Sequence, residues 1–167
     1  MATVLFTNLN ELKKTTPLSG NIDGDKIVEF IKMAQEIHVQ QLIGTDLYVK
    51  LMNDIETNVL TGDYSTLVND YIKPVVNHQT FAMYLPFASL IVSSKGVFKH
   101  TSENSNDVDT DEVNSLTDKY NGYVNYYKQR LSDYLCANSE LFPEYFTNTE
   151  EDVDPRKHNS NLDWYLY

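Results

Sequence analysis

The chain has 167 residues, with 13 Lys and Arg against 24 Asp and Glu, so its formal net charge is −11. A chain of this length usually forms one domain and buries about 70% of its unfolded surface. The acidic balance argues against a protein that grips nucleic acid through phosphates, because that affinity comes mostly from Lys and Arg. The single cysteine excludes an internal disulfide framework, the longest apolar stretch is too short to cross a bilayer, and no secretory signal is recognised at the start.

The first third of the chain predicts an arm followed by two helices. Residues 1–23 contain Pro17, Gly20 and many polar side chains, and we expect an irregular N-terminal arm with at most a short turn near residues 8–14. Apolar residues then recur every three or four positions from about residue 24 to Gly44, which predicts a helix with one buried face. Gly44 ends this helix, and a second helix is expected from Thr45 to about residue 59.

A long helical pattern follows from Ser65. Pro74 and Pro86 interrupt the pattern, and since proline removes a backbone donor, we expect two helices or one kinked helix. The segment Phe81–Val92 is apolar on nearly all sides, as is typical of a helix at the centre of a bundle. A brief extended piece is predicted at 96–99.

The last helix begins at Asp109 or Thr110, after a polar linker at residues 100–110. Asp109 with Glu112 three positions later forms a capping-box pattern, and a stripe of apolar and Tyr residues continues to Leu135. The predicted fold class is therefore all-α, a small bundle of four to five helices with extended arms at both ends. Its predicted parts are the arm at 1–23, the bundle at 24–138 and an aromatic and acidic tail at 139–167.

Acidic residues gather in the linker region. Six of them and no Lys or Arg lie between residues 101 and 118. Such a run is either a solvent-exposed face or an acidic wall that repels a polyanion such as DNA. In the second case, the candidate wall residues are Asp107, Asp109 and Asp111. A calcium loop at these positions is disfavoured, because Glu112 stands where the loop needs glycine.

Aromatic residues gather near the end of the chain. Tyr and Trp are enriched where one protein docks on another, although they also fill cores. The candidate interface residues are Phe142, Tyr145, Phe146, Trp164, Tyr165 and Tyr167. The Tyr-rich stripe at 120–134 is interpreted instead as core, because its spacing is helical.

The sequence predicts no enzyme, no cofactor and no metal site. It lacks the glycine-rich phosphate loops and the nucleophile elbow, and its four histidines share no metal-ligand spacing. His38 is expected at the edge of the first helix, and Cys136 is expected to be a buried small hydrophobe. A helical enzyme with an unrecognised site remains an alternative.

Three stretches resemble a known family when they are taken in order: Ile31–Gln35 with Gln41–Tyr48, Lys95–Phe98 with the polar linker after it, and Tyr126–Leu135. The sequence is similar to the head–tail connector (adaptor, or head-completion) proteins of tailed bacteriophages, especially those of Bacteroidetes phages, the crAss-like group among them. The similarity covers most of residues 20–140.

The resemblance implies a structural virion protein without an active site. It implies a homo-oligomeric ring, commonly a dodecamer, that docks below the portal protein, contacts adjacent tail or ring proteins and extends the channel through which DNA passes without specific binding. The expected location is the head–tail junction of the virion, after synthesis in the host cytoplasm, with no membrane partner. A small acidic binding module, such as a DNA-mimicking regulatory protein, is the alternative.

Overall fold

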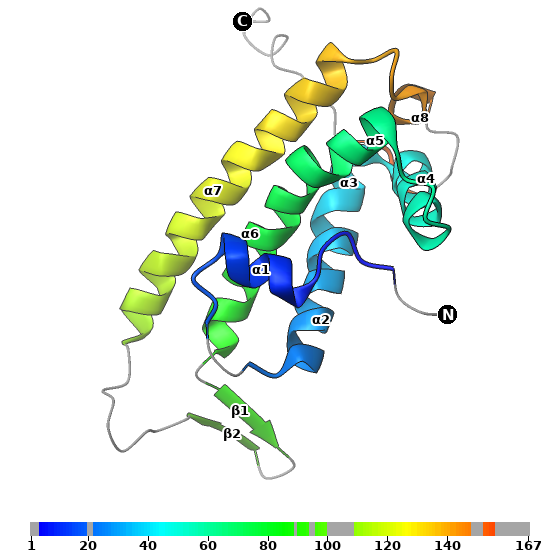
Figure 1. Cartoon of the computed structure of the whole chain (residues 1–167). Helices are drawn as coiled ribbons and strands as arrows, with labels where there is room; N and C mark the ends of the chain where they lie inside the picture. The colour runs from blue at the N-terminus through cyan, green and yellow to red at the C-terminus, as the bar shows by residue number, and fades with distance from the viewer. Residues whose placement is uncertain are drawn as a thin grey trace, which may run out of the picture.

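The computed structural model describes residues 4–19, 22–88, 90–93, 96–99, 109–147 and 152–155. They form a small helical bundle (Figure 1), which confirms the all-α prediction. Helix α6 (Lys73–Tyr84) is the central element, because it contacts α1, α2, α7 and the turns on either side of it in the chain.

The first predicted helix is a continuous rod built from three elements. Helix α2 (Gly24–Ala34) leads into a π-helical turn, η1 (Gln35–Val39), and then into α3 (Gln40–Ile43). The Asp23 carboxylate accepts a hydrogen bond from the backbone of Asp25 and so caps the first turn. Gly44 ends the rod with φ of 80°, a conformation that favours glycine, and α4 (Thr45–Glu56) starts directly after it.

The second rod runs from α5 (Gly62–Thr66) through a π-helical turn, η2 (Leu67–Ile72), into α6 and the 3₁₀ turn η3 (Leu85–Phe87). Pro74 lies at the second position of α6, directly after the π-helical turn, where the regular pattern of helical hydrogen bonds is already interrupted. The expectation of a helix over the whole of Phe81–Val92 is wrong, because the helical structure ends around Pro86.

A short antiparallel hairpin follows instead. Strand β1 (Leu90–Ser93) pairs with β2 (Gly96–Lys99), with Ile91 opposite Phe98. Strand β2 corresponds to the extended piece predicted at 96–99. Pro86 cannot continue a regular helix, and the β-branched Ile91 and Val92 favour an extended backbone.

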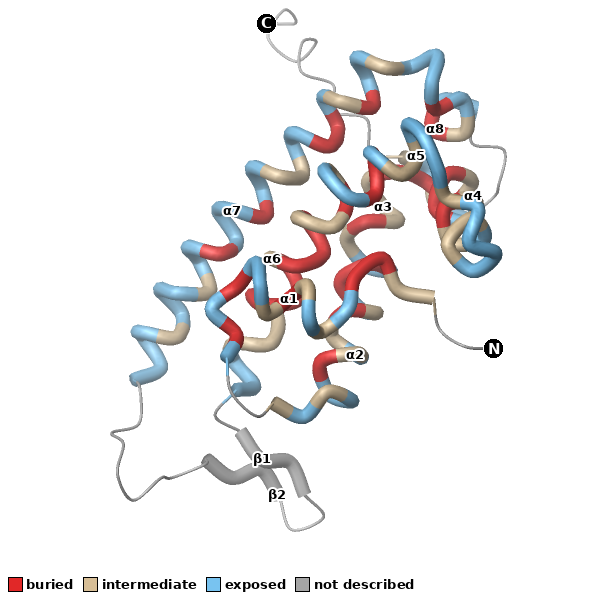
Figure 2. The backbone as a smooth tube through the Cα atoms, viewed as in Figure 1, coloured by how far each residue is buried: buried red, intermediate tan, exposed pale blue. Residues whose placement is uncertain are grey.

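The longest described helix is α7 (Thr110–Ala137), which lies along α6. Asp109 caps it and forms the predicted capping box with Glu112. The first turns of α7 extend past the rest of the bundle, and Figure 2 shows its buried positions along one side only. After α7 the chain reverses and forms a short helix, α8 (Pro143–Thr147), which packs against α4.

The N-terminal region departs from the predicted irregular arm. It contains the helix α1 (Leu9–Thr15), with Asn8 as its cap, at the place where a short turn was expected. Phe6, Leu12 and Leu18 are buried in the common core. The described residues before 20 therefore belong to the bundle, because three large apolar side chains lose contact with water there.

The predicted tail at 139–167 is also partly bundle. Residues 139–147 carry core side chains, and residues 152–155 lie against the start of α4. The described parts of both predicted arms are thus packed onto their own subunit.

Candidate functional site

Two of the predicted interface aromatics are core residues. Phe142 and Tyr145 have no exposed surface. The Phe142 ring packs edge-on against Tyr64, at 5.4 Å between centroids, and also contacts the ring of Tyr134. Burial, with a further effect of the neighbouring Cys136 thiol, raises the pKa of Tyr145 to about 12. The interface prediction is wrong for both, because α8 folds back and turns them inward.

Phe146 is the predicted interface aromatic that reaches the surface within the described residues. Its side chain is 39% exposed, and its ring stands edge-on to Tyr145 at 4.9 Å. Trp164, Tyr165 and Tyr167 lie outside the described residues. The same holds for Asp107 among the predicted channel acids.

The other two predicted channel acids lie at the start of α7 and are exposed. Asp109 has a structural function, since its carboxylate caps the helix and accepts a hydrogen bond from the backbone of Thr110. Asp111 lies in the first turn, where negative charge interacts favourably with the helix dipole. Both carboxylates remain available to face a polyanion.

An exposed apolar surface lies on α7, where the sequence predicted only core. Leu116 is 40%, Tyr123 43% and Tyr126 65% exposed, and we call these three residues the α7 flank. These residues alternate along α7 with the buried Tyr120 and Val124, so periodicity alone suggested burial. Tyr120, on the same helix, is buried as expected and packs against Phe81.

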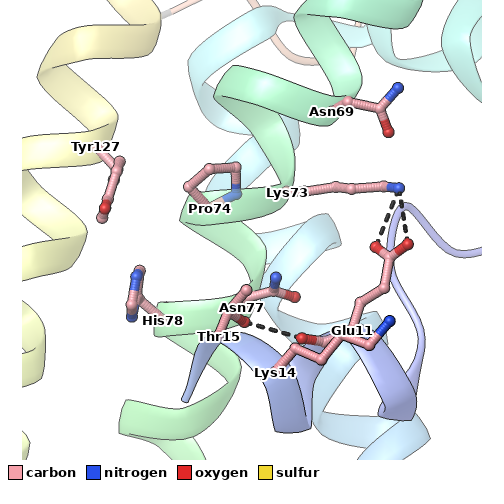
Figure 3. A pocket seen from close by; sticks show the side chains of 9 residues that line it. All are labelled: Glu11, Lys14, Thr15, Asn69, Lys73, Pro74, Asn77, His78 and Tyr127. Carbon is pink, nitrogen blue, oxygen red and sulfur yellow. Dashed lines mark hydrogen bonds and ion pairs between the residues drawn. The ribbon is translucent and has the colours of Figure 1, made fainter.

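A pocket of about 570 Å³ lies between α1, α6 and α7 (Figure 3). Its lining residues are Glu11, Lys14, Thr15, Asn69, Lys73, Pro74, Asn77, His78 and Tyr127. On one side the Lys73 ammonium pairs with the Glu11 carboxylate at 3.0 Å. Sequence reasoning missed this site, because its residues come from three segments and share no motif.

Two buried polar atoms of the pocket residues have no hydrogen-bond partner among the described residues. Asn77 is only 3% exposed, and its Oδ1 has no hydrogen-bond partner among the described residues. The Nδ1 of His78 is likewise buried without a partner there. The His78 ring stacks on Tyr127, with centroids 5.0 Å apart and planes 9° apart, and burial lowers the pKa of His78 from its usual 6.5. The pocket therefore offers neutral hydrogen-bonding groups beside aromatic faces.

Residues 152–155 form a strap across the junction of α3 and α4. The Asp152 carboxylate accepts hydrogen bonds from Gln40 Nε2 at 3.0 Å and from Thr45 Oγ1 at 3.2 Å. The backbone carbonyl of Val153 accepts from the Thr45 amide, and the Val153 amide donates to the Thr45 hydroxyl. The strap thus supplies the cap that Gly44 cannot provide, and it fixes the chain shortly before the C-terminal aromatic residues.

The remaining single candidates lie away from the pocket. His38 contacts Lys128, with 3.3 Å between its Nδ1 and the Lys128 Nζ, and it is half-buried on its rod as predicted. Cys136 was expected to be buried, and it is exposed. Across the described ranges, His, Cys, Asp and Glu side chains form no group of three suited to hold a metal ion. In those same ranges, no helix has the length and apolarity needed to cross a membrane.

Fold and site together define a small acidic helical bundle with an exposed apolar flank on α7 and a mainly polar pocket between α1, α6 and α7. The model of the family described as a family of unknown function, DUF6712, matches residues 39–155, and the chain belongs to this family. The matched region begins in η1 and ends at the last residue of the strap. No curated protein and no solved structure matches the chain.

Proposed function

We propose that the protein is a structural virion protein, a head–tail connector subunit of a tailed bacteriophage. In this proposal, copies of the chain form a homo-oligomeric ring below the portal protein, and the ring extends the DNA channel and contacts the adjacent tail or ring proteins. The resemblance of residues 20–140 to connector proteins motivates the proposal. The proposal assigns no chemical reaction to the subunit.

The observation that carries the proposal is the α7 flank. An exposed Leu and two exposed Tyr on one long helix are the composition found where subunits meet, since aromatic side chains combine a large apolar area with a hydrogen-bonding group. The three side chains are already exposed on α7, whose first turns extend past the bundle (Figure 1), so a neighbouring copy can contact the flank without disturbing the core. Ring subunits need such a surface to make head-to-tail contacts that close on themselves.

The net charge of −11 also supports this function. An acidic channel wall repels the DNA backbone, so the polyanion passes without adhering. The exposed Asp109 and Asp111 are the described candidates for this wall. The burial of Phe142 and Tyr145 removes them from the proposed interface, and the α7 flank and Phe146 are its remaining candidate residues.

The test replaces one flank residue with a charge. Tyr126→Lys places a cation in the proposed contact, while Asn125→Lys makes the same replacement at the neighbouring exposed position, on another side of the helix. We expect the unaltered chain and Asn125→Lys to sediment as rings, alone or with portal protein, and Tyr126→Lys to remain a monomer. Ring formation by Tyr126→Lys would show that the flank is not part of the interface. If the unaltered chain stays a monomer and is not recruited by portal protein, the connector function is refuted.

The acidic character alone supports a second function, a small acidic binding or DNA-mimic regulatory protein. The acidic protein would then bind to a basic surface of a partner and block the binding of DNA to that surface. A stable monomer that competes with DNA for such a partner would favour this alternative over the connector.

A further inference from the structure

The pocket between α1, α6 and α7 contains a buried acceptor that lacks a donor. Nearly all buried polar atoms in proteins have a hydrogen-bond partner, and leaving one without a partner destabilises the protein. Asn77 is almost fully buried and its Oδ1 is unpartnered within the described residues. Figure 3 shows the Asn77 amide between His78 and Glu11, among the residues that line the pocket. A donor brought in from outside would satisfy this oxygen.

The walls of the pocket suit a flat aromatic group. Tyr127 and His78 stack on each other in one wall of the pocket, and Pro74 adds a third apolar surface to its lining. The volume of about 570 Å³ lies within the range of pockets that bind organic groups, roughly 300–1,000 Å³. The matching occupant is therefore an aromatic side chain that donates one hydrogen bond.

The chain itself contains such a side chain. Trp164 is the single tryptophan of the sequence and lies in the apolar segment Leu162–Tyr167. The indole carries one N–H donor and no acceptor, so it complements an unpaired carbonyl oxygen better than a hydroxyl does. Asp163 precedes it, and Lys14 stands exposed among the pocket residues with charge of the opposite sign.

We propose that the pocket receives the Trp164 side chain of a second copy of the chain, with the indole N–H donating to Asn77 Oδ1. This inference rests on the proposed function, because it requires copies that assemble. The strap at 152–155 holds the chain on its own subunit only a few residues before the segment. A segment anchored on one subunit and inserted into the next is a head-to-tail contact, the kind that closes rings.

The experiment uses the full-length chain, in which all tryptophan fluorescence comes from Trp164. The emission maximum and its quenching by acrylamide are measured over a dilution series, with sedimentation recorded in parallel. We expect a solvent-like emission in the dilute monomer, and a blue shift with reduced quenching as the protein assembles. The concentration at the midpoint of this shift is the quantity to compare between variants.

Two pocket variants and one control locate the binding site. Asn77→Leu removes the acceptor, and Lys14→Glu at the exposed edge opposes Asp163 without touching the core. Lys26→Glu makes the same charge change on the exposed side of α2, away from the pocket. We expect the midpoint to rise by about tenfold or more in both pocket variants, which corresponds to about 1.4 kcal/mol, and to stay unchanged in Lys26→Glu.

Several results would overturn the inference. A blue shift that is independent of concentration would place Trp164 on its own subunit, and equal midpoints in all variants would place it in another site. Rings with solvent-exposed Trp164 would refute the insertion and leave the connector proposal standing. A dimer that shows the variant-sensitive shift would support the insertion and refute the ring, while a monomer with exposed Trp164 at every concentration would refute both.

Discussion

The side-chain oxygen of Gln35 accepts a hydrogen bond from the backbone N–H of Phe6, 29 positions earlier in the chain, at 3.2 Å. The same amide group donates to the Val4 carbonyl at 3.0 Å and to the Tyr48 hydroxyl at 3.2 Å. Gln35 is fully buried, so one polar side chain joins the N-terminal region to η1 and α4. This contact explains how a segment predicted to be irregular becomes part of the bundle.

Gln35→Leu should destabilise the protein by about 1–3 kcal/mol, because it keeps the volume and leaves the Phe6 N–H and the Val4 carbonyl without partners. Urea unfolding followed by circular dichroism measures the loss. Gln129→Leu on the exposed face of α7 is the matched control and should change stability by about 0.5 kcal/mol or less. Equal stabilities of the two variants would show that the N-terminal region does not depend on Gln35.

The position of α8 predicts opposite results for two phenylalanines four residues apart. Phe142→Ala should cost about 3–5 kcal/mol of unfolding free energy, because the fully buried ring leaves a cavity between α5, α7 and α8. Phe146→Ala, on the exposed side of α8, should cost about 1 kcal/mol or less. Thermal and chemical unfolding of the two variants compares them directly. If Phe142→Ala lowers the unfolding free energy only slightly, the core position of Phe142 is contradicted and this residue is again a candidate for the interface.

His78 should make stability depend on pH. Burial lowers its pKa in the folded protein below the usual 6.5, so below that value the unfolded chain binds more protons than the folded one. Above pH 6.5 the neutral His78 does not lower the free energy of unfolding. As the pH falls below 6.5, protonation of this histidine in the unfolded chain lowers the free energy of unfolding. We expect the melting temperature to fall less between about pH 7 and pH 5 in His78→Gln than in the unaltered protein. Other titrating groups are common to both proteins, so identical pH profiles would contradict the burial of a neutral His78.

At the start of α7, the negative charges of Asp109 and Asp111 can be tested separately from the helix cap that Asp109 provides. Asparagine caps a helix about as well as aspartate, so Asp109→Asn with Asp111→Asn removes two charges and keeps the helix start. If these residues face the channel, particles with the double variant should assemble normally and release DNA more slowly, with a difference that diminishes at high salt. Asp109→Ala should instead cost about 1 kcal/mol of stability through the lost cap. Unchanged release by the double Asn variant would leave both acids as solvated surface.

The helix boundaries could largely be predicted from the sequence, because local signals set them. Gly44 and the capping box of Asp109 with Glu112 lie where the structure has a helix end and a helix start. The role of Gln35 could not be predicted, although a polar residue inside the apolar stripe of the first helix was a usable signal. Its partners are distant in the chain, and only the tertiary fold brings them together.

The aromatic residues show the limit of sequence reasoning most clearly. Phe142 and Phe146 have the same side chain and similar neighbours, yet one is buried and the other half-exposed. Which ring turns inward depends on the direction in which α8 leaves Pro143. The pocket was equally hidden, because Glu11, Asn77 and Tyr127 come together only when α1, α6 and α7 pack.

The two π-helical turns, η1 and η2, each hold more residues per turn than the α-helices they interrupt. Each rod therefore contains a surplus amino acid that a regular helix of the same length would omit. If all the residues of η1 instead formed a regular α-helix, the surplus residue would rotate everything beyond it by about 100°. Ile43 and Leu47, which are buried, would then face away from the core. The π-helical turns therefore keep the buried faces of successive helical segments on the same side of the rod.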